Sequence, residues 1–178
     1  MKRVRVLLLF TLLAFLAGCA GFQKFSSKEF GFSFEYPSEW TDIRTKDHSG
    51  ILLVSYDKSS WLSIERITSL TVMSKFFEIS DPGIGNSETN LDLLYEGFLS
   101  ADSGKAKVPE ARLGKAGADS GVDSIHKVFI KDTVRLIRFV LFKKGSTFYK
   151  IETSMLEKDK DQYAPVYGSI IDSFTIIQ

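Results

Sequence analysis

The sequence predicts one α+β domain, an α/β/α sandwich in which a mainly antiparallel sheet is covered by helices on both faces. Apolar and polar residues alternate over several short segments, as they do in half-buried strands. Elsewhere apolar residues recur at helical spacing, which indicates amphipathic helices. Segment 133–142 is apolar on both sides, and this is typical of a central strand with a layer on each face.

A leader precedes this domain. Basic residues fill three of the first five positions, and an apolar run follows from Val6 to Ala17, as in a secretory signal peptide. The run ends in Leu16-Ala17-Gly18-Cys19. Lipoprotein signal peptidase cleaves before a cysteine in this setting, so Cys19 is expected to be the lipidated first residue of a bacterial lipoprotein. A chance cysteine fits less well, and the run is shorter than the roughly 20 residues that span a bilayer.

The expected organisation is a signal peptide over 1–18, a lipidated N-terminus with a short tether over 19–24, and one domain over 25–178. At roughly 3.5 Å per residue, the tether holds the domain within about 20 Å of the bilayer. Without the leader the chain carries 20 basic and 22 acidic residues. A nearly neutral domain argues against nucleic acid or an anionic lipid surface as the main partner.

The first half of the domain reads as strands. Phe30, Phe32, Phe34 and Tyr36 alternate with smaller or polar residues, and Pro37 ends the segment. Further strands are expected over 40–44, 51–56, 61–67 and 72–79. The spacing of Leu91, Leu94, Tyr95, Phe98 and Leu99 then predicts a helix of about three turns.

The second half reads as an antiparallel meander followed by a helix. Strands are expected over 110–116, 122–131, 133–142 and 146–155. Apolar residues from Tyr163 to Phe174 lie at helical spacing. Because proline is tolerated in the first turn of a helix, Pro165 predicts a helix start close to Ala164. A short strand over 174–177 closes the chain.

Two segments resemble a known family. Residues 31–40, Gly-Phe-Ser-Phe-Glu-Tyr-Pro-Ser-Glu-Trp, resemble the opening strand and turn of PsbP-like and Mog1-like domains. Residues 148–151 and the helix ending at Ser173-Phe174 resemble the last hairpin and helix of the same domains, and DcrB-type lipoproteins are among these relatives. The resemblance implies an antiparallel sheet between helical layers and mostly non-enzymatic roles. Different members have different partners, so it implies no particular function.

Catalytic and metal-binding patterns are weak. His48 lies in a polar turn and His126 on a strand, far apart in sequence, and neither has the nucleophile, base and orienting group that a triad needs. Asp119, Asp123 and the acidic residues of 157–161 are conceivable calcium ligands. However, the first two lack a full ligand loop, and lysines alternate with the acidic residues of 157–161. We expect no enzyme, cofactor or metal.

Aromatic residues near turns are the remaining candidates for a binding site. Tyr56, Trp61, Phe76 and Phe77 could edge a groove for a partner peptide or an apolar ligand, although packing in the core or at its rim explains them more simply. The expected function is a non-catalytic protein-binding or assembly module of the cell envelope. The alternatives are a carrier of an apolar ligand and an enzyme of unrecognised type. Cys19 tethers it to the outer membrane in a diderm, facing the periplasm, or otherwise to the outer face of the cytoplasmic membrane.

Overall fold

The structure is a computed structural model that describes residues 21–44, 50–67, 105–130 and 132–177. The larger of its two sheets contains, in spatial order, β3 (Thr41–Arg44), β4 (Gly50–Val54), β5 (Trp61–Ile67), β9 (Thr147–Leu156), β8 (Thr133–Lys144), β7 (Ser120–Ile130) and β6 (Lys105–Lys107). The smaller sheet consists, in order, of β1 (Phe22–Ser27), β2 (Phe32–Pro37) and β10 (Thr175–Ile176). All neighbouring strands are antiparallel, which confirms the predicted α+β class.

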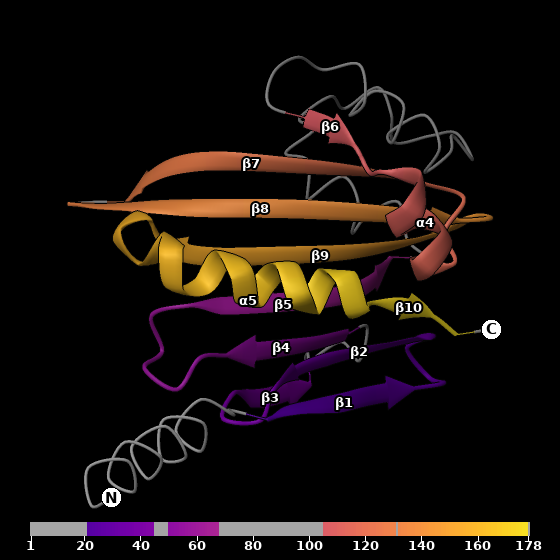
Figure 1. The fold of residues 1–178 in the computed structure, drawn as a ribbon, viewed down its shortest axis with the longest axis horizontal. Helices are drawn as coiled ribbons and strands as arrows, with labels where there is room; N and C mark the ends of the chain where they lie inside the picture. Colours follow the sequence, from indigo (N-terminus) through magenta and orange to yellow (C-terminus); the bar gives the residue numbers. More distant parts are fainter. Residues whose placement is uncertain (1–20, 45–49, 68–104, 131, 178) are drawn as a thin grey trace, which may run out of the picture.

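Helices α4 (Glu110–Ala116) and α5 (Lys160–Ser173) lie on one face of the larger sheet, with α5 running along its strands (Figure 1). A short 3-10 turn, η2 (Glu157–Asp159), leads into α5. The core between α5, the smaller sheet and the larger sheet is rich in aromatic rings. Phe142 of the sheet stacks on Phe174 at the end of α5, with ring centroids 5.3 Å apart, so the two layers are in direct contact.

The predicted strand is β2, which starts at Phe32 because Phe30 and Gly31 belong to the preceding turn. Phe32, Phe34 and Tyr36 are buried whereas Glu35 is exposed, and Pro37 is the last residue of the strand. Because β2 pairs with β1 on one side and β10 on the other, both sides of its backbone are hydrogen-bonded. Its side chains then pack beneath α5.

Strand β8 is internal to the larger sheet, as its apolar character predicted. Val140 and Phe142 belong to the core below α5. On the opposite face Leu141 is also buried, together with Phe148 and Ile67. Both helices of the described residues lie on the first face, and the helix predicted over 91–99 falls outside the described residues. A helical layer on the second face therefore stays a prediction, as does the strand over 72–79.

The strand predicted over 110–116 is wrong, because this segment is helix α4. Its residues are mostly good helix formers, and Leu113 and Ala116 stand three apart on the side that faces the core. Pro109 precedes the helix and Gly117 ends it with a φ of 72°, the left-handed conformation that glycine adopts without strain. A proline before a segment and a glycine after it are typical of a short helix. We gave more weight to the alternation of apolar residues and therefore missed this helix.

The predicted start of the last helix is also wrong. Helix α5 begins at Lys160, which places Pro165 in its second turn. Pro165 and Asp161 are exposed, so water can hydrogen-bond the carbonyl that proline leaves without a donor. Among the helices of the described residues, none combines the length and the apolar character needed to cross a bilayer.

Strand pairing begins within residues 19–24, the segment predicted from the sequence to include a tether. Strand β1 begins at Phe22 and pairs with β2 along its whole length, from Phe22 opposite Pro37 to Ser27 opposite Phe32. Its side chains are mostly exposed, because it is an edge strand, and it therefore shows no alternating pattern. Strand pairing thus starts three residues after Cys19, which itself lies outside the described residues.

Candidate binding pocket

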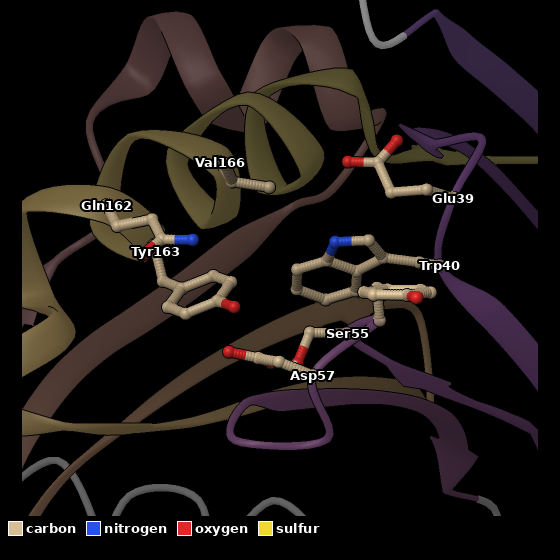
Figure 2. Close-up of a pocket in the computed structure, with 8 residues that line it drawn as sticks. Glu39, Trp40, Ser55, Asp57, Gln162, Tyr163 and Val166 are labelled. Atoms are coloured by element: carbon tan, nitrogen blue, oxygen red, sulfur yellow. The ribbon is translucent and has the colours of Figure 1, made fainter.

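An open pocket of about 430 Å³ lies where the β2–β3 connection, the β4–β5 turn and the start of α5 meet. We call it the aromatic pocket. Figure 2 shows the rings of Trp40 and Tyr163 facing its interior from two different segments. Its lining residues are Glu39, Trp40, Ser55, Tyr56, Asp57, Gln162, Tyr163 and Val166.

Hydrogen bonds among short polar side chains fix the β4–β5 turn. The Ser55 hydroxyl donates to Asp57 Oδ1 at 2.7 Å. The backbone N–H and the hydroxyl of Ser59 donate to Oδ1 and Oδ2 of the same carboxylate at 3.0 and 2.8 Å. The backbone N–H of Ser60 donates in turn to Ser55 Oγ at 3.1 Å. This network closes the turn even though Lys58 has a φ of 58°, which is unfavourable for a residue with a side chain.

The carboxylate of Asp57 remains ionised in this network. Its pKa is held well below the ordinary value, most strongly by the Ser55 hydroxyl and then by the Ser59 backbone N–H, with the Ser59 and Tyr163 hydroxyls adding to the effect. Hydrogen bonds to the charged form stabilise that form. The aromatic pocket therefore carries a permanent negative charge at its wall, and Glu39 adds a second acidic side chain.

Trp40 and Tyr163 form the aromatic wall of the pocket, and Tyr167 of α5 packs against Trp40. The Trp40 ring meets Tyr163 and Tyr167 edge-on, with centroid distances of 6.1 and 5.7 Å. Such edge-to-face geometry is favourable for aromatic pairs. Trp40 and Tyr167 are almost fully buried. Trp40 thus forms the base of the pocket, and its contact with Tyr167 helps to set its orientation.

Tyr167 anchors this base through its hydroxyl. The hydroxyl lies 2.5 Å from Ser60 Oγ, 3.0 Å from the Trp61 carbonyl and 2.9 Å from the Ser154 carbonyl. Burial raises the pKa of Tyr167 far above its ordinary value. Tyr167 therefore stays neutral and fastens α5 to the β4–β5 turn and to β9.

These features define the chemistry that the aromatic pocket favours. Aromatic faces attract apolar groups and cations, and the negative charge of Asp57 disfavours anions. The Ser55 hydroxyl and the Asp57 carboxylate already bind each other. The site is thus suited to binding an apolar or positively charged group.

The structure places one of the aromatic candidates at the pocket. Tyr56 lines it and is 85% exposed. Trp61 is not among the lining residues and touches the site only through its carbonyl, which accepts from Tyr167. Phe76, Phe77 and His48 lie outside the described residues. Their proposed roles stay predictions.

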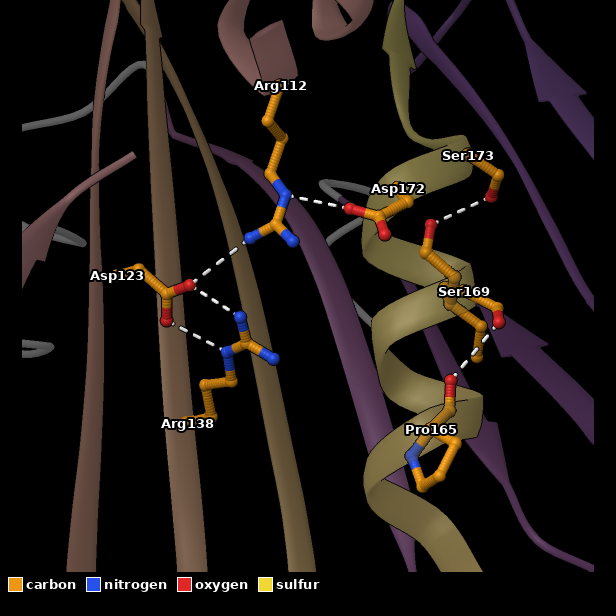
Figure 3. Close-up of polar contacts among 8 residues, drawn as sticks. Arg112, Asp123, Arg138, Pro165, Ser169, Asp172 and Ser173 are labelled. Carbon is orange, nitrogen blue, oxygen red and sulfur yellow. Dashed lines mark hydrogen bonds and ion pairs between the residues drawn. The ribbon is translucent and has the colours of Figure 1, made fainter. Parts of the chain in front are cut away.

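The calcium candidates are engaged in other contacts. Asp123 accepts two hydrogen bonds from Arg138 and one from Arg112, which also binds Asp172 of α5 at 2.7 Å (Figure 3). Asp119 binds Lys144 and the backbone N–H of residue 145. Within the described ranges no group of three or more His, Cys, Asp or Glu residues is placed to hold a metal ion.

The remaining sequence candidates also lie away from the aromatic pocket. His126 lies beside Ser124, with 3.2 Å between Nε2 and Oγ, and its ring packs near Phe139. Glu157 pairs with Lys127 at 2.8 Å. Sequence reasoning missed Asp57 and Gln162 as pocket residues. The signal for Asp57 was its position between serines in the turn at 55–60, a spacing that allows each serine to reach one carboxylate.

Comparison with known proteins identifies the fold. No family model matches the chain, and no curated protein sequence is similar to it. A protein from Bacteroides thetaiotaomicron has a TM-score of 0.59 and 15% identity, and the match covers 88% of this chain and 48% of that protein. The chain thus spans about half the length of the Bacteroides protein. Cyanobacterial PsbP (CyanoP) from Synechocystis has a TM-score of 0.55 and 16% identity. The match covers 89% of this chain and 94% of CyanoP.

The Ran-binding protein Mog1p of Saccharomyces cerevisiae has a TM-score of 0.49 and 8% identity. The match covers 89% of this chain and 97% of Mog1p. A mutant of Mog1 reaches a TM-score of 0.50 at the same identity. The chain is therefore an α+β domain with an open aromatic pocket. Its fold is the PsbP/Mog1-like fold, which confirms the resemblance seen in the sequence. At these identities the likeness establishes the fold alone.

Proposed function

We propose that this protein is a lipid-anchored, non-catalytic binding module of the bacterial cell envelope, and that the aromatic pocket is its binding site. The proposal rests on the observation that polar groups of the pocket wall hydrogen-bond to one another. Ser55, Asp57 and Ser59 bind one another and hold the turn, whereas the rings of Trp40 and Tyr163 and the exposed Tyr56 line the pocket. Such a site provides complementary surface without a poised nucleophile.

The anchor is the lipid on Cys19. In a diderm bacterium, Ala20 after the lipidated cysteine favours the periplasmic face of the outer membrane. In a monoderm, the protein sits on the outer face of the cytoplasmic membrane. We expect Cys19→Ser to move the protein from the membrane fraction to the soluble extract of the envelope, whereas Ala20→Ser, which keeps the cysteine, leaves it in the membrane. A Cys19→Ser protein that stays with the membrane although its leader has been cleaved, as its mass would show, would contradict the proposed anchoring.

The proposed partner is an envelope protein that places an apolar or basic side chain in the pocket. A photo-crosslinking amino acid at position 56 in intact cells tests this, because Tyr56 is exposed and lines the opening. We expect one reproducible adduct that Val166→Trp abolishes by filling the pocket. The same probe at Ser146, in the β8–β9 turn, is the control. Equal adducts from positions 56 and 146, or none with several crosslinkers, would contradict the proposal.

A carrier of an apolar small ligand is the second candidate, because a volume of about 430 Å³ lies within the range of ligand pockets. Native mass spectrometry of the Cys19→Ser protein, released gently from cells, measures this directly. A carrier gives an added mass that disappears in Val166→Trp. If each protein shows only the mass that its own sequence gives, the result would argue for the protein partner instead.

A further inference from the structure

The β7–β8 hairpin ends in a pair of exposed apolar side chains. Phe129 is 73% exposed and Ile130 is 46% exposed. Single exposed apolar residues are common on protein surfaces, so their exposure alone has no functional meaning. The position of this pair in the molecule is what distinguishes it.

The described residues on both sides of the tip are paired up to its last residues. Strands β7 and β8 pair without interruption from Ser120 opposite Lys143 to Ile130 opposite Thr133. The Thr133 hydroxyl donates to the Ile130 carbonyl at 2.9 Å and closes the turn. In Figure 1 the tip extends beyond the start of α5. Phe129 and Ile130 are therefore held in place before they meet any partner.

The polypeptide enters the domain at the same end. The backbone N–H of Ser38 donates to the Gly21 carbonyl at 2.8 Å, and Phe22, which is 48% exposed, pairs with Pro37. Only Ala20 separates Gly21 from Cys19. Two residues of extended chain span about 7 Å, so the lipidated residue cannot lie far from this edge of the domain.

A series of contacts connects the entry point with the hairpin tip. Trp40 lines the aromatic pocket two residues after Ser38. Across the pocket, the Ser59 carbonyl accepts a hydrogen bond from Arg135 Nη2 at 3.0 Å. Arg135 is two residues from Thr133, where β8 begins. In Figure 1 the start of β1, the β4–β5 turn, the start of α5 and the β7–β8 tip all lie toward the same end of the domain, which we call the anchor end.

We propose that the anchor end rests on the bilayer, with Phe129 and Ile130 inserted into its interface and the mouth of the aromatic pocket at the membrane surface. This inference rests on the lipidation of Cys19 proposed above. A tether of two residues leaves the domain little freedom to turn this end away. Aromatic side chains are favoured at the interface, and apolar insertion requires no excess of positive charge on a nearly neutral domain. The pocket then receives groups presented at the membrane surface.

The test uses the full lipoprotein reconstituted into vesicles of phosphatidylethanolamine and phosphatidylglycerol. The chain has one cysteine, whose thiol carries the lipid, so Ile130→Cys supplies one free thiol for an environment-sensitive dye. Ser146→Cys is the matched control. It lies beyond the far end of β8, which is about 36 Å long. Flotation of the vesicles reports anchoring, and quenching by spin-labelled lipid reports insertion.

We expect the dye at position 130 to shift to shorter wavelength and to be quenched by the lipid at least about twofold more than the dye at position 146. Adding Phe129→Ser should reduce this quenching, whereas adding Ile125→Ser should not. Ile125 is 57% exposed on the same strand but lies away from the tip.

Three results would overturn the inference. Protein that does not float with the vesicles would refute the anchoring and this inference together. Protein that floats while the dye at position 130 behaves like the dye at position 146 would refute only the insertion. A dye shielded from aqueous quencher but unaffected by quencher in the lipid would show that the tip contacts a second copy of the protein.

Discussion

Replacing Tyr167 with Phe removes the one hydroxyl that joins α5, the β4–β5 turn and β9. Tyr167 is 1% exposed, and its hydroxyl meets Ser60 Oγ at 2.5 Å and the Trp61 and Ser154 carbonyls at 3.0 and 2.9 Å. The ring stays in place in the variant, so packing against Trp40 is preserved. The substitution therefore isolates the contribution of the hydrogen bonds.

The expected loss follows from the bonds that one hydroxyl can make. It donates one hydrogen bond, shared between the two carbonyls, and accepts one from Ser60. At about 1 kcal/mol for each buried neutral bond, the variant loses roughly 2 kcal/mol of unfolding free energy. Ser60 Oγ can still donate to the Ser154 carbonyl at 3.2 Å, which keeps the loss from being larger. For a domain of this size the melting temperature should fall by about 6 °C.

Urea unfolding of the Cys19→Ser protein, followed by tryptophan fluorescence, measures this loss. Tyr56→Phe is the control, because it makes the same chemical change at a side chain that is 85% exposed, and we expect it to stay within about 0.5 kcal/mol of the parent. If Tyr167→Phe also stays within that range with an unchanged slope, the hydroxyl does not fasten α5 and the argument for a rigid pocket base fails.

Other substitutions test separate parts of the structure. Because the pKa of Asp57 is lowered in the folded protein, its carboxylate stabilises the fold above the ordinary pKa near 4, and this contribution is lost as pH falls toward the folded-state pKa. We therefore expect the free energy of unfolding of Asp57→Asn to fall less steeply with decreasing pH below about 4 than that of the parent protein. Asp123→Ala leaves the guanidinium of Arg138, which is 19% exposed, without its carboxylate. Asp123→Ala should lower the free energy of unfolding by about 2 to 4 kcal/mol, as measured by urea titration. Adding Arg138→Met in the double variant should restore part of this loss. A Cβ on Gly50 would lie 2.0 Å from a backbone carbonyl oxygen of β5, whereas one on Gly114 meets nothing within 4 Å. Gly50→Ala should therefore lower the melting temperature strongly, and Gly114→Ala should raise stability by up to about 1 kcal/mol.

The sequence predicted the elements whose side chains alternate between core and solvent. The alternation that ends at Pro37 specified β2, and the two apolar sides of 133–142 specified the internal strand β8. The sequence pattern did not predict strand β1 or helix α4. Strand β1 lies at an edge and buries little, so its side chains show no period. Helix α4 has only seven residues, too few for helical spacing to stand out from alternation.

The proposed lipid attachment at Cys19 and the polar turn at 55–60 are each predicted from consecutive residues, because a peptidase and a tight turn both depend on local sequence. The aromatic pocket cannot be predicted in this way. Trp40, Asp57 and Tyr163 come from three segments, and only the pairing of β4 with β5 and the packing of α5 on the larger sheet bring them together. In the same way, β7 and β8 place Phe129 at the end of the domain where Gly21 enters. Local pattern determined most of the strands and predicts the membrane address. The aromatic pocket depends on contacts between residues far apart in the chain, so the tertiary structure decided it.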